Sequence, residues 1–123
     1  MAHASITRNG EGYLLTKKSM EYFRGHYLPD PKDWTDWRAS PLLAPSLKGV
    51  APAMVLTAGF DPLVDEGREY AERLKREGVQ TEHRDYPDMI HGFIVMGGVL
   101  DTANEAVADC CAALRRAFEK VTV

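Results

Sequence analysis

The chain has 123 residues, enough for one domain or less, and its 45% hydrophobic and 27% charged residues are typical of a globular protein. A formal net charge of −3, with scattered basic residues, argues against binding to nucleic acid or to an anionic membrane surface. No segment approaches the roughly 20 consecutive apolar residues that a membrane-spanning helix needs. We therefore expect a single domain over residues 1–123, without a membrane span and without a nucleic-acid partner.

Cysteine usage and the N-terminal sequence indicate a cytoplasmic setting. The N-terminal region is polar and lacks the apolar core of a signal peptide. The two cysteines, Cys110 and Cys111, are adjacent, which is not the spacing of a structural zinc site. We expect no bound metal and no cofactor.

The first half of the chain predicts one helix and a long loop. Residues 1–12 are expected to be irregular, because two glycines favour a loop there. Apolar residues at helical spacing predict a helix from Thr16 to Leu28, which Pro29 ends. Residues 29–52 contain five prolines and are expected to form a long loop.

The middle of the chain predicts a strand, a helix and a second strand. Residues 53–59 (AMVLTAG) form a nearly continuous apolar run, typical of a parallel strand that is buried on both faces. A helix with an acidic first turn should follow, starting between positions 62 and 65, with Gly78 just beyond its C-terminus. Residues 81–86 alternate but carry charges on both faces, which indicates an edge strand.

The last helix has the clearest pattern. The stretch Thr102–Glu105 reads as a capping box, and apolar residues at helical spacing then continue to Val121. Cys110 and Cys111 lie on this apolar stripe, so we expect them to pack rather than to do redox chemistry.

This order of elements predicts an α/β fold with parallel strands flanked by helices. The strand at 53–59 is apolar enough to need a neighbour on each side, but the chain offers one convincing neighbour, at 81–86. The sheet is therefore expected to be incomplete. The chain is either a fragment of a larger sheet or part of an obligate oligomer.

Asp61 and His91 are the candidate catalytic pair. Asp61 directly follows the first predicted strand, and His91 follows the second after a short loop at 87–90. Because the carboxyl ends of parallel strands meet at one edge of a sheet, the two side chains should lie together, as the acid and base of a Ser-His-Asp triad. Two alternatives stay open: Asp61 as an ordinary helix N-cap and His91 as an ordinary loop residue.

Two motifs carry a resemblance to a known family. Residues 58–67 read AGFDPLVDEG and residues 89–93 read MIHGF. In this order and spacing, with GYLLT at 12–16, they resemble the C-terminal part of the hormone-sensitive-lipase family of carboxylesterases and lipases. The resemblance implies the C-terminal part of an α/β-hydrolase fold, holding the last two strands of an eight-stranded sheet.

The same resemblance implies roles for individual residues. Asp61 matches the triad acid and His91 the triad base, while Met89, Ile90 and Phe93 either help to wall an ester pocket or pack as an apolar loop. The Gly-x-Ser-x-Gly nucleophile motif and the His-Gly-Gly-Gly oxyanion loop are absent from the sequence. The chain would act on small acyl esters only when completed by an N-terminal segment. The alternative is a non-catalytic fragment that forms a homo-oligomer through exposed strand edges.

Overall fold

A computed structural model describes residues 3–119. The chain divides into two compact units, Met1–His91 and Gly92–Val123, and each is described by itself. A single domain over the whole chain stays a prediction. The elements, in chain order, are α1 (Ala4–Arg8), α2 (Lys17–Tyr27), the short 3-10 helices η1 (Pro31–Thr35) and η2 (Pro41–Leu43), β1 (Ala53–Phe60), α3 (Val64–Arg76), β2 (Thr81–Ile90), η3 (Phe93–Val95) and α4 (Asp101–Glu119).

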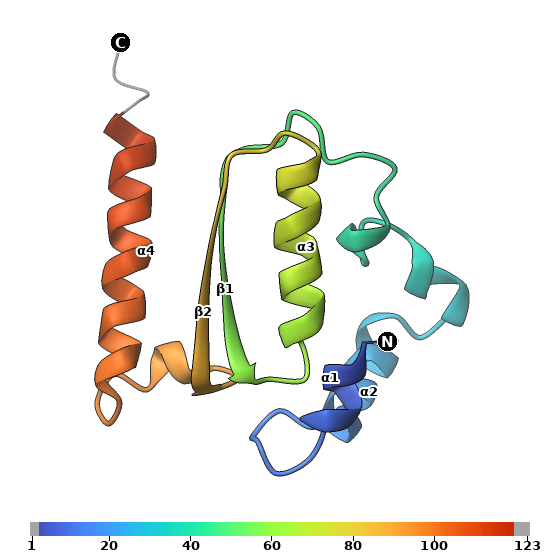
Figure 1. Ribbon diagram of the computed structural model, residues 1–123. Helices are drawn as coiled ribbons and strands as arrows, with labels where there is room; N and C mark the ends of the chain where they lie inside the picture. The colour runs from blue at the N-terminus through green and yellow to red at the C-terminus, as the bar shows by residue number, and fades with distance from the viewer. Residues whose placement is uncertain (1–2, 120–123) are drawn as a thin grey trace. The chain divides into compact units, whose positions relative to one another are not determined.

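The first unit is built on a parallel pair of strands. β1 and β2 form a two-stranded parallel sheet, and α3, which connects them, lies along the sheet (Figure 1). Gly78 has φ +83°, the left-handed conformation expected just beyond the helix. The predicted α/β class with parallel strands, and an incomplete sheet, is confirmed.

The second strand is longer than predicted. Ala58 pairs with Tyr86 and Phe60 pairs with Ile90, so three residues of β2 lie opposite the single residue Gly59. Pro87 lies in this irregular stretch, and proline, which has no N–H to donate to a ladder, is tolerated at such bulges. The loop predicted at 87–90 is therefore wrong, because proline is tolerated at a bulge within a strand.

The core lies between β1, α3 and the loop before β1. Its buried members are Ala44, Leu47, Leu74 and Val79, with Ala53, Val55 and Tyr70 packed against them. Within β1 itself, Thr57 and Ala58 are buried, and the other residues are half-buried or exposed. The prediction that this strand is buried on both faces is wrong for this chain, because only Thr57 and Ala58 of its eight residues are buried.

A polar network ties the two strands to α3. Thr57 Oγ1 donates to Asp85 Oδ1 at 2.9 Å and lies 2.9 Å from His83 Nε2. Arg68 of α3 forms an ion pair with the same Asp85 carboxylate. The charges that predicted an edge strand on β2 are thus partly paired across the sheet, through residues far apart in the sequence.

The proline-rich loop is fixed to the C-terminal end of α3 by an arginine and a glutamate. The Arg73 guanidinium donates to the carbonyls of Leu42 and Ala44 and pairs with Glu77. The Glu77 carboxylate also accepts hydrogen bonds from the Leu47 N–H and the Ser46 hydroxyl. These contacts hold the loop against α3, where η2 forms one wall of the pocket described below.

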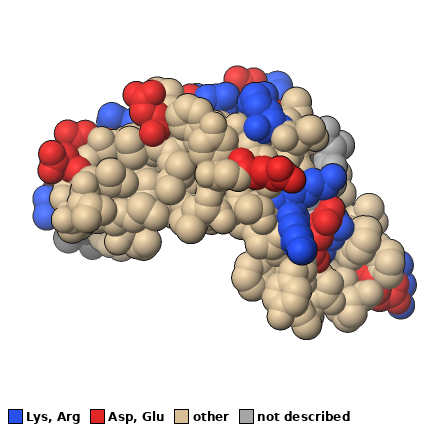
Figure 2. Space-filling model, turned by 90° about the horizontal axis from the view of Figure 1, so that it is seen from below, with Lys and Arg blue, Asp and Glu red and all other residues tan. Residues whose placement is uncertain are grey.

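Charges of both signs lie on the surface of the protein. On the face shown in Figure 2, Lys and Arg side chains are intermixed with Asp and Glu side chains rather than separated from them. Within residues 3–119, no helix is long and apolar enough to cross a membrane.

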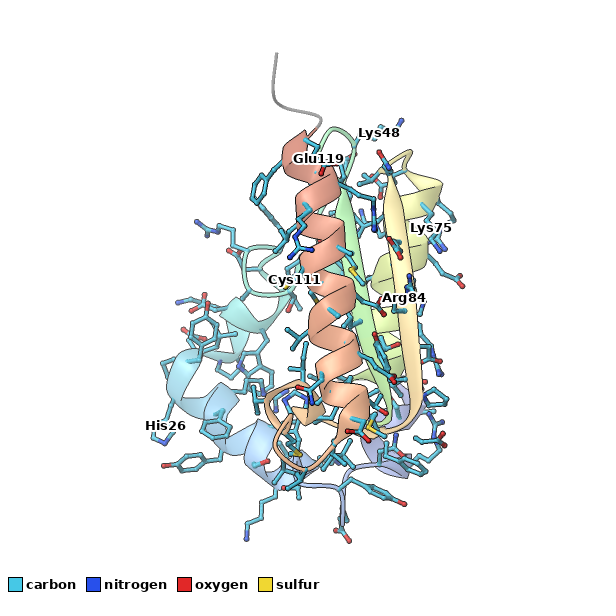
Figure 3. The ribbon with its side chains drawn as sticks, turned by 90° about the vertical axis from the view of Figure 1, so that its left-hand side faces the viewer. His26, Lys48, Lys75, Arg84, Cys111 and Glu119 are labelled. Carbon is cyan, nitrogen blue, oxygen red and sulfur yellow. The ribbon has the colours of Figure 1, made fainter. Side chains whose placement is uncertain are left out.

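Helix α2 matches its prediction closely. The Thr16 hydroxyl accepts from the Ser19 N–H at 3.1 Å, and the Ser19 hydroxyl accepts from the Thr16 N–H, which makes a reciprocal cap. Trp34 holds the following loop to this helix, because its indole N–H donates to the Leu28 carbonyl at 2.9 Å. His26 is exposed and lies on the outer side of α2 (Figure 3).

The second unit consists of η3 and α4. Ala103 and Ala106 of α4 are buried, as is Phe93 of η3. Cys111 is exposed on α4, and Val121, the end of the predicted apolar stripe, lies outside the described residues. The helix begins at Asp101, one residue before the expected cap, so Thr102 is helical rather than an N-cap.

The bulge leads to a prediction about Gly59. A β-carbon at this position would collide with the backbone carbonyl of Pro87, whereas a β-carbon at Gly25, inside α2, would meet open space. Gly59→Ala should destabilise the chain by about 1–3 kcal/mol, and Gly25→Ala should stabilise it by about 0.5–1 kcal/mol. Urea unfolding of both variants measures the difference. Equal stability of the two variants would show that β1 and Pro87 do not approach in this way.

A second prediction concerns pH. The Leu47 N–H, the Arg73 guanidinium and the Ser46 hydroxyl hold the pKa of Glu77 far below its ordinary value, at about 2. A carboxylate with a depressed folded-state pKa stabilises the fold above its unfolded value, and this stabilisation is lost as the pH falls toward 2. Glu77→Gln should therefore be less stable than wild type at pH 7, with the difference shrinking below about pH 4.

Urea titrations at pH 7 and pH 3 test this. The matched control is Glu72→Gln, an exposed glutamate on the same helix, which should behave as wild type at both pH values. If Glu77→Gln lowers the free energy of unfolding by the same amount at pH 7 and pH 3, the stabilisation does not come from the charge of Glu77, and the prediction is wrong.

Candidate active site

Asp61 is held by two separate contacts at the end of β1. Its Oδ1 accepts a hydrogen bond from the Leu63 N–H at 2.8 Å, and its Oδ2 lies 2.8 Å from Nδ1 of His91. The side chain is 13% exposed. The alternative of Asp61 as the helix N-cap is wrong, because the cap position of α3 is Leu63 and has no side-chain cap hydrogen bond. One oxygen of Asp61 instead holds the turn before α3, while the other meets the imidazole.

His91 reaches Asp61 because of the strand register. Phe60 and Ile90 are partners in the sheet, so the residues that follow them leave neighbouring strand ends. The predicted proximity of Asp61 and His91 is thus confirmed. The His91 side chain is 42% exposed, three times as exposed as its partner, and with Nδ1 on the carboxylate its Nε2 is the atom left to meet a reacting group.

An open pocket of about 450 Å³ lies beside the pair. Its walls come from η2, β1 and α3, and they are mostly apolar. Besides Asp61 and His91, lining residues include Leu42, Leu56, Ala58, Leu63, Gly67 and Tyr70. The pair therefore borders an apolar hollow that belongs entirely to the first unit.

The three residues predicted to line an ester pocket lie elsewhere. Met89 and Ile90 are the last two residues of β2 and are half-buried, and Phe93 opens η3 in the second unit and is buried. The pocket beside His91 is lined by other residues. A substrate-binding role for these three stays a prediction.

Sequence reasoning missed α1, which contacts the turn that carries Asp61. Ser5 is fully buried, and its hydroxyl donates to the Pro62 carbonyl at 2.6 Å. Asn9 is 4% exposed, and its Nδ2 donates to the carbonyls of Gly59 and Asp61 at 2.9 and 3.0 Å. The expectation that residues 1–12 are irregular is wrong for 4–8. No local sequence pattern marks these residues, because their partners lie 50 or more residues away.

The carboxylate of Asp65 is used to hold α1. It accepts from the Ser5 N–H at 2.8 Å and pairs with Arg8 at 3.2 Å. Burial raises the pKa of Asp65, but the Ser5 and Arg8 contacts outweigh it and leave that pKa below the ordinary value. Asp65 is thus ionised in the first turn of α3, where a negative charge suits the helix dipole.

Two other histidines also have partners that the sequence did not indicate. His3 pairs with Glu69 at 2.7 Å, and His83 contacts Thr57 as described above. Within residues 3–119, no group of three or more His, Cys, Asp or Glu side chains is arranged to hold a metal ion.

Comparison with known proteins identifies the family of this chain. A family model described as alpha/beta hydrolase fold matches residues 1–95. The chain belongs to this family. The resemblance of the two motifs to carboxylesterases is confirmed, because named relatives are carboxylic ester hydrolases and carboxylesterases.

Relatives are similar over almost the whole chain. Carboxylic ester hydrolase LipN of Mycobacterium tuberculosis is 43% identical over 112 residues, which is 87% of this chain and 30% of LipN. Ethyl acetate hydrolase of Pseudomonas putida is 38% identical over 112 residues, covering 91% of this chain and 35% of that protein. The structure of ester-hydrolase EH1AB1, from the metagenome of Lake Arreo, in complex with a derivative of bipyridine phosphonate, matches with a TM-score of 0.91. It is 43% identical and covers 97% of this chain and 38% of that one.

The chain thus spans about a third of the length of the alpha/beta hydrolases it matches. It holds one parallel strand pair of the fold, together with the acid and imidazole side chains at the carboxyl end of that pair.

Proposed function

We propose that this chain is the acid–base segment of a serine carboxylesterase that acts on small acyl esters. Asp61 would orient His91, and His91 would serve as general base and acid for a serine on a segment outside this chain. The observation that carries the proposal is the 2.8 Å contact between His91 Nδ1 and Asp61 Oδ2. In a hydrolytic triad such a contact holds the imidazole and leaves Nε2 for the nucleophile.

The reaction would run in two acyl-transfer steps. Nε2 of His91 takes the proton of the serine hydroxyl as its oxygen attacks the ester carbonyl, and the imidazolium is stabilised by the Asp61 carboxylate. His91 then returns the proton to the departing alcohol, which leaves an acyl-serine. Water, deprotonated by His91, then attacks the acyl-serine, and His91 returns that proton to the serine oxygen as the carboxylic acid is released. Backbone amides outside this chain would bind the oxyanion.

We further propose that the chain alone does not hydrolyse esters. The sequence holds four serines and no Gly-x-Ser-x-Gly motif. Each serine hydroxyl bonds to a neighbour that fixes the local structure: Ser5 to the Pro62 carbonyl, Ser19 to the Thr16 carbonyl, Ser40 to the Trp34 carbonyl and Ser46 to Glu77. None of these settings is the sharp strand-to-helix turn that exposes a nucleophile.

Three finer points belong to this proposal. Met89, Ile90 and Phe93 would contact the substrate once the fold is complete. The enzyme would need neither metal nor cofactor, since triad chemistry uses side chains and backbone amides alone. A cytoplasmic location fits two cysteines that are both free.

A second candidate function is self-association. Within the described residues, β1 and β2 pair only with each other, so each strand has one edge without a strand partner. Unpaired edges favour pairing with another chain. The homo-oligomer would then form through strand-to-strand contact between copies. Sedimentation velocity on the purified chain tests this: a dimer supports it, and a monomer at all accessible concentrations rejects it.

The catalytic proposal is tested in a single-chain chimera. The N-terminal part of Pseudomonas putida ethyl acetate hydrolase, cut where similarity to this chain begins, is joined to residues 1–123. The chimera should hydrolyse a short nitrophenyl ester. Asp61→Asn should lower kcat by about 10⁴-fold, because the imidazole is left in the wrong tautomer, and His91→Ala should cost at least as much.

Glu72→Gln, on the exposed side of α3, is the matched control and should keep full activity. A folded, active chimera that is insensitive to Asp61→Asn and His91→Ala would overturn the proposal. Activity of the isolated chain would overturn the claim that the nucleophile lies outside it.

A further inference from the structure

We infer that Asn9 is a positioning residue for the triad acid. It acts on catalysis through Asp61, without touching the reacting atoms. This inference rests on the proposed function, because it assigns Asn9 to the same Asp61–His91 pair.

The contacts of Asn9 cross the end of β1. Its Nδ2 donates one hydrogen bond to the Gly59 carbonyl at 2.9 Å and one to the Asp61 carbonyl at 3.0 Å. The Asn9 amide therefore joins Gly59, near the end of β1, to Asp61, the proposed triad acid. Both hydrogens of the NH₂ group are used, so only a side chain with two donors can make this bridge.

The turn held by Asn9 is also restrained by the Leu63 N–H, which donates to Asp61 Oδ1, and by the Ser5 hydroxyl, which donates to the Pro62 carbonyl. Gly59 is the residue where the β1–β2 register breaks, so the ladder does not hold this point evenly. Asp61 directly follows Phe60, the last residue of β1, and its carbonyl also accepts the Val64 N–H at 3.2 Å, at the start of α3. Asn9 thus contacts the segment between the end of β1 at Phe60 and the start of α3 at Val64.

Both ends of α1 contact the segment after β1, through Ser5 near the N-terminus of the helix and Asn9 at its C-cap. Ser5, four residues before Asn9, binds the Pro62 carbonyl and Asp65, and the Asn9 N–H donates to the Ser5 carbonyl at 2.8 Å. The helix has only five residues, too short to be stable by itself. It is therefore held by these contacts, and in turn it holds the backbone of 59–62 that carries the acid.

Small displacements of Asp61 matter for the imidazole. Its Oδ2 must lie within hydrogen-bond distance of His91 Nδ1 to select the tautomer with Nε2 free. Removing the Asn9 amide leaves two buried carbonyls without these partners, and the turn is then expected to relax. The expected consequence is a loss of the single imidazole tautomer rather than a loss of the fold.

The test is an NMR measurement on the ¹⁵N-labelled chain itself. Wild type should show a hydrogen-bonded Nδ1–H proton for His91 and ring nitrogen shifts of the Nδ1–H tautomer. In Asn9→Ala, and in the isosteric Asn9→Asp, the Nδ1–H signal should be lost and the ring nitrogens should report a tautomer mixture. The control is Asn104→Ala, since the Asn104 amide donates to the Gly97 carbonyl; it should leave the His91 signals unchanged.

Asp61→Asn separates this inference from the proposed function. If Asp61→Asn leaves the His91 signals unchanged, the pair itself is wrong and the proposed function fails. If Asp61→Asn changes them while both folded Asn9 variants do not, only the role of Asn9 is overturned.

A measurement on wild type tests the inference even if the Asn9 variants do not fold. The buried Asn9 side-chain amide protons should exchange with solvent more slowly than those of Asn104, the other asparagine in the sequence, which is exposed. Equal exchange rates for the two asparagines would overturn the inference.

Discussion

The register of one pair of parallel strands brings the side chains of Asp61 and His91 together. Beyond Ala58 the ladder breaks, and Phe60 pairs with Ile90 only because β2 accommodates extra residues around Pro87. Gly59 permits this, since any β-carbon there would meet the Pro87 backbone. The residues that follow the rejoined strands are Asp61 and His91, and their side chains meet at 2.8 Å. A backbone irregularity thus positions an acid and an imidazole from segments 30 residues apart.

Other contacts of the first unit hold the segments around Asp61 and His91 in place. α1 holds the turn after β1 through buried amide and hydroxyl groups. Arg73 and Glu77 hold the proline-rich loop against α3, so that η2 faces the pocket beside His91. The chain spans about a third of the length of related carboxylic ester hydrolases, and its strands have unpaired edges within the described residues. These features support the proposal that His91 acts on a serine outside this chain.

Much of this could be predicted from local sequence. The apolar run ending at Asp61 and the helix after it depend on short-range patterns, and so does the αL glycine at position 78. The extension of β2 could not be predicted, because a proline argues against a strand unless its bulge is known. α1 could not be predicted either, because five residues have little helical preference and their partners lie more than 50 residues away. The partners of His3 and His83 could not be predicted for the same reason, because they lie far from these histidines in the sequence.

The most direct test is intact-mass measurement after treatment with a fluorophosphonate, a reagent that labels activated serines. The isolated chain should gain no adduct, and the chimera with an esterase N-terminal part should gain one adduct on the serine of the added part. Labelling of the chimera should be lost with His91→Ala, because the imidazole is what activates that serine. An adduct on Ser5, Ser19, Ser40 or Ser46 of the isolated chain would contradict the account, since the nucleophile would then lie within this chain.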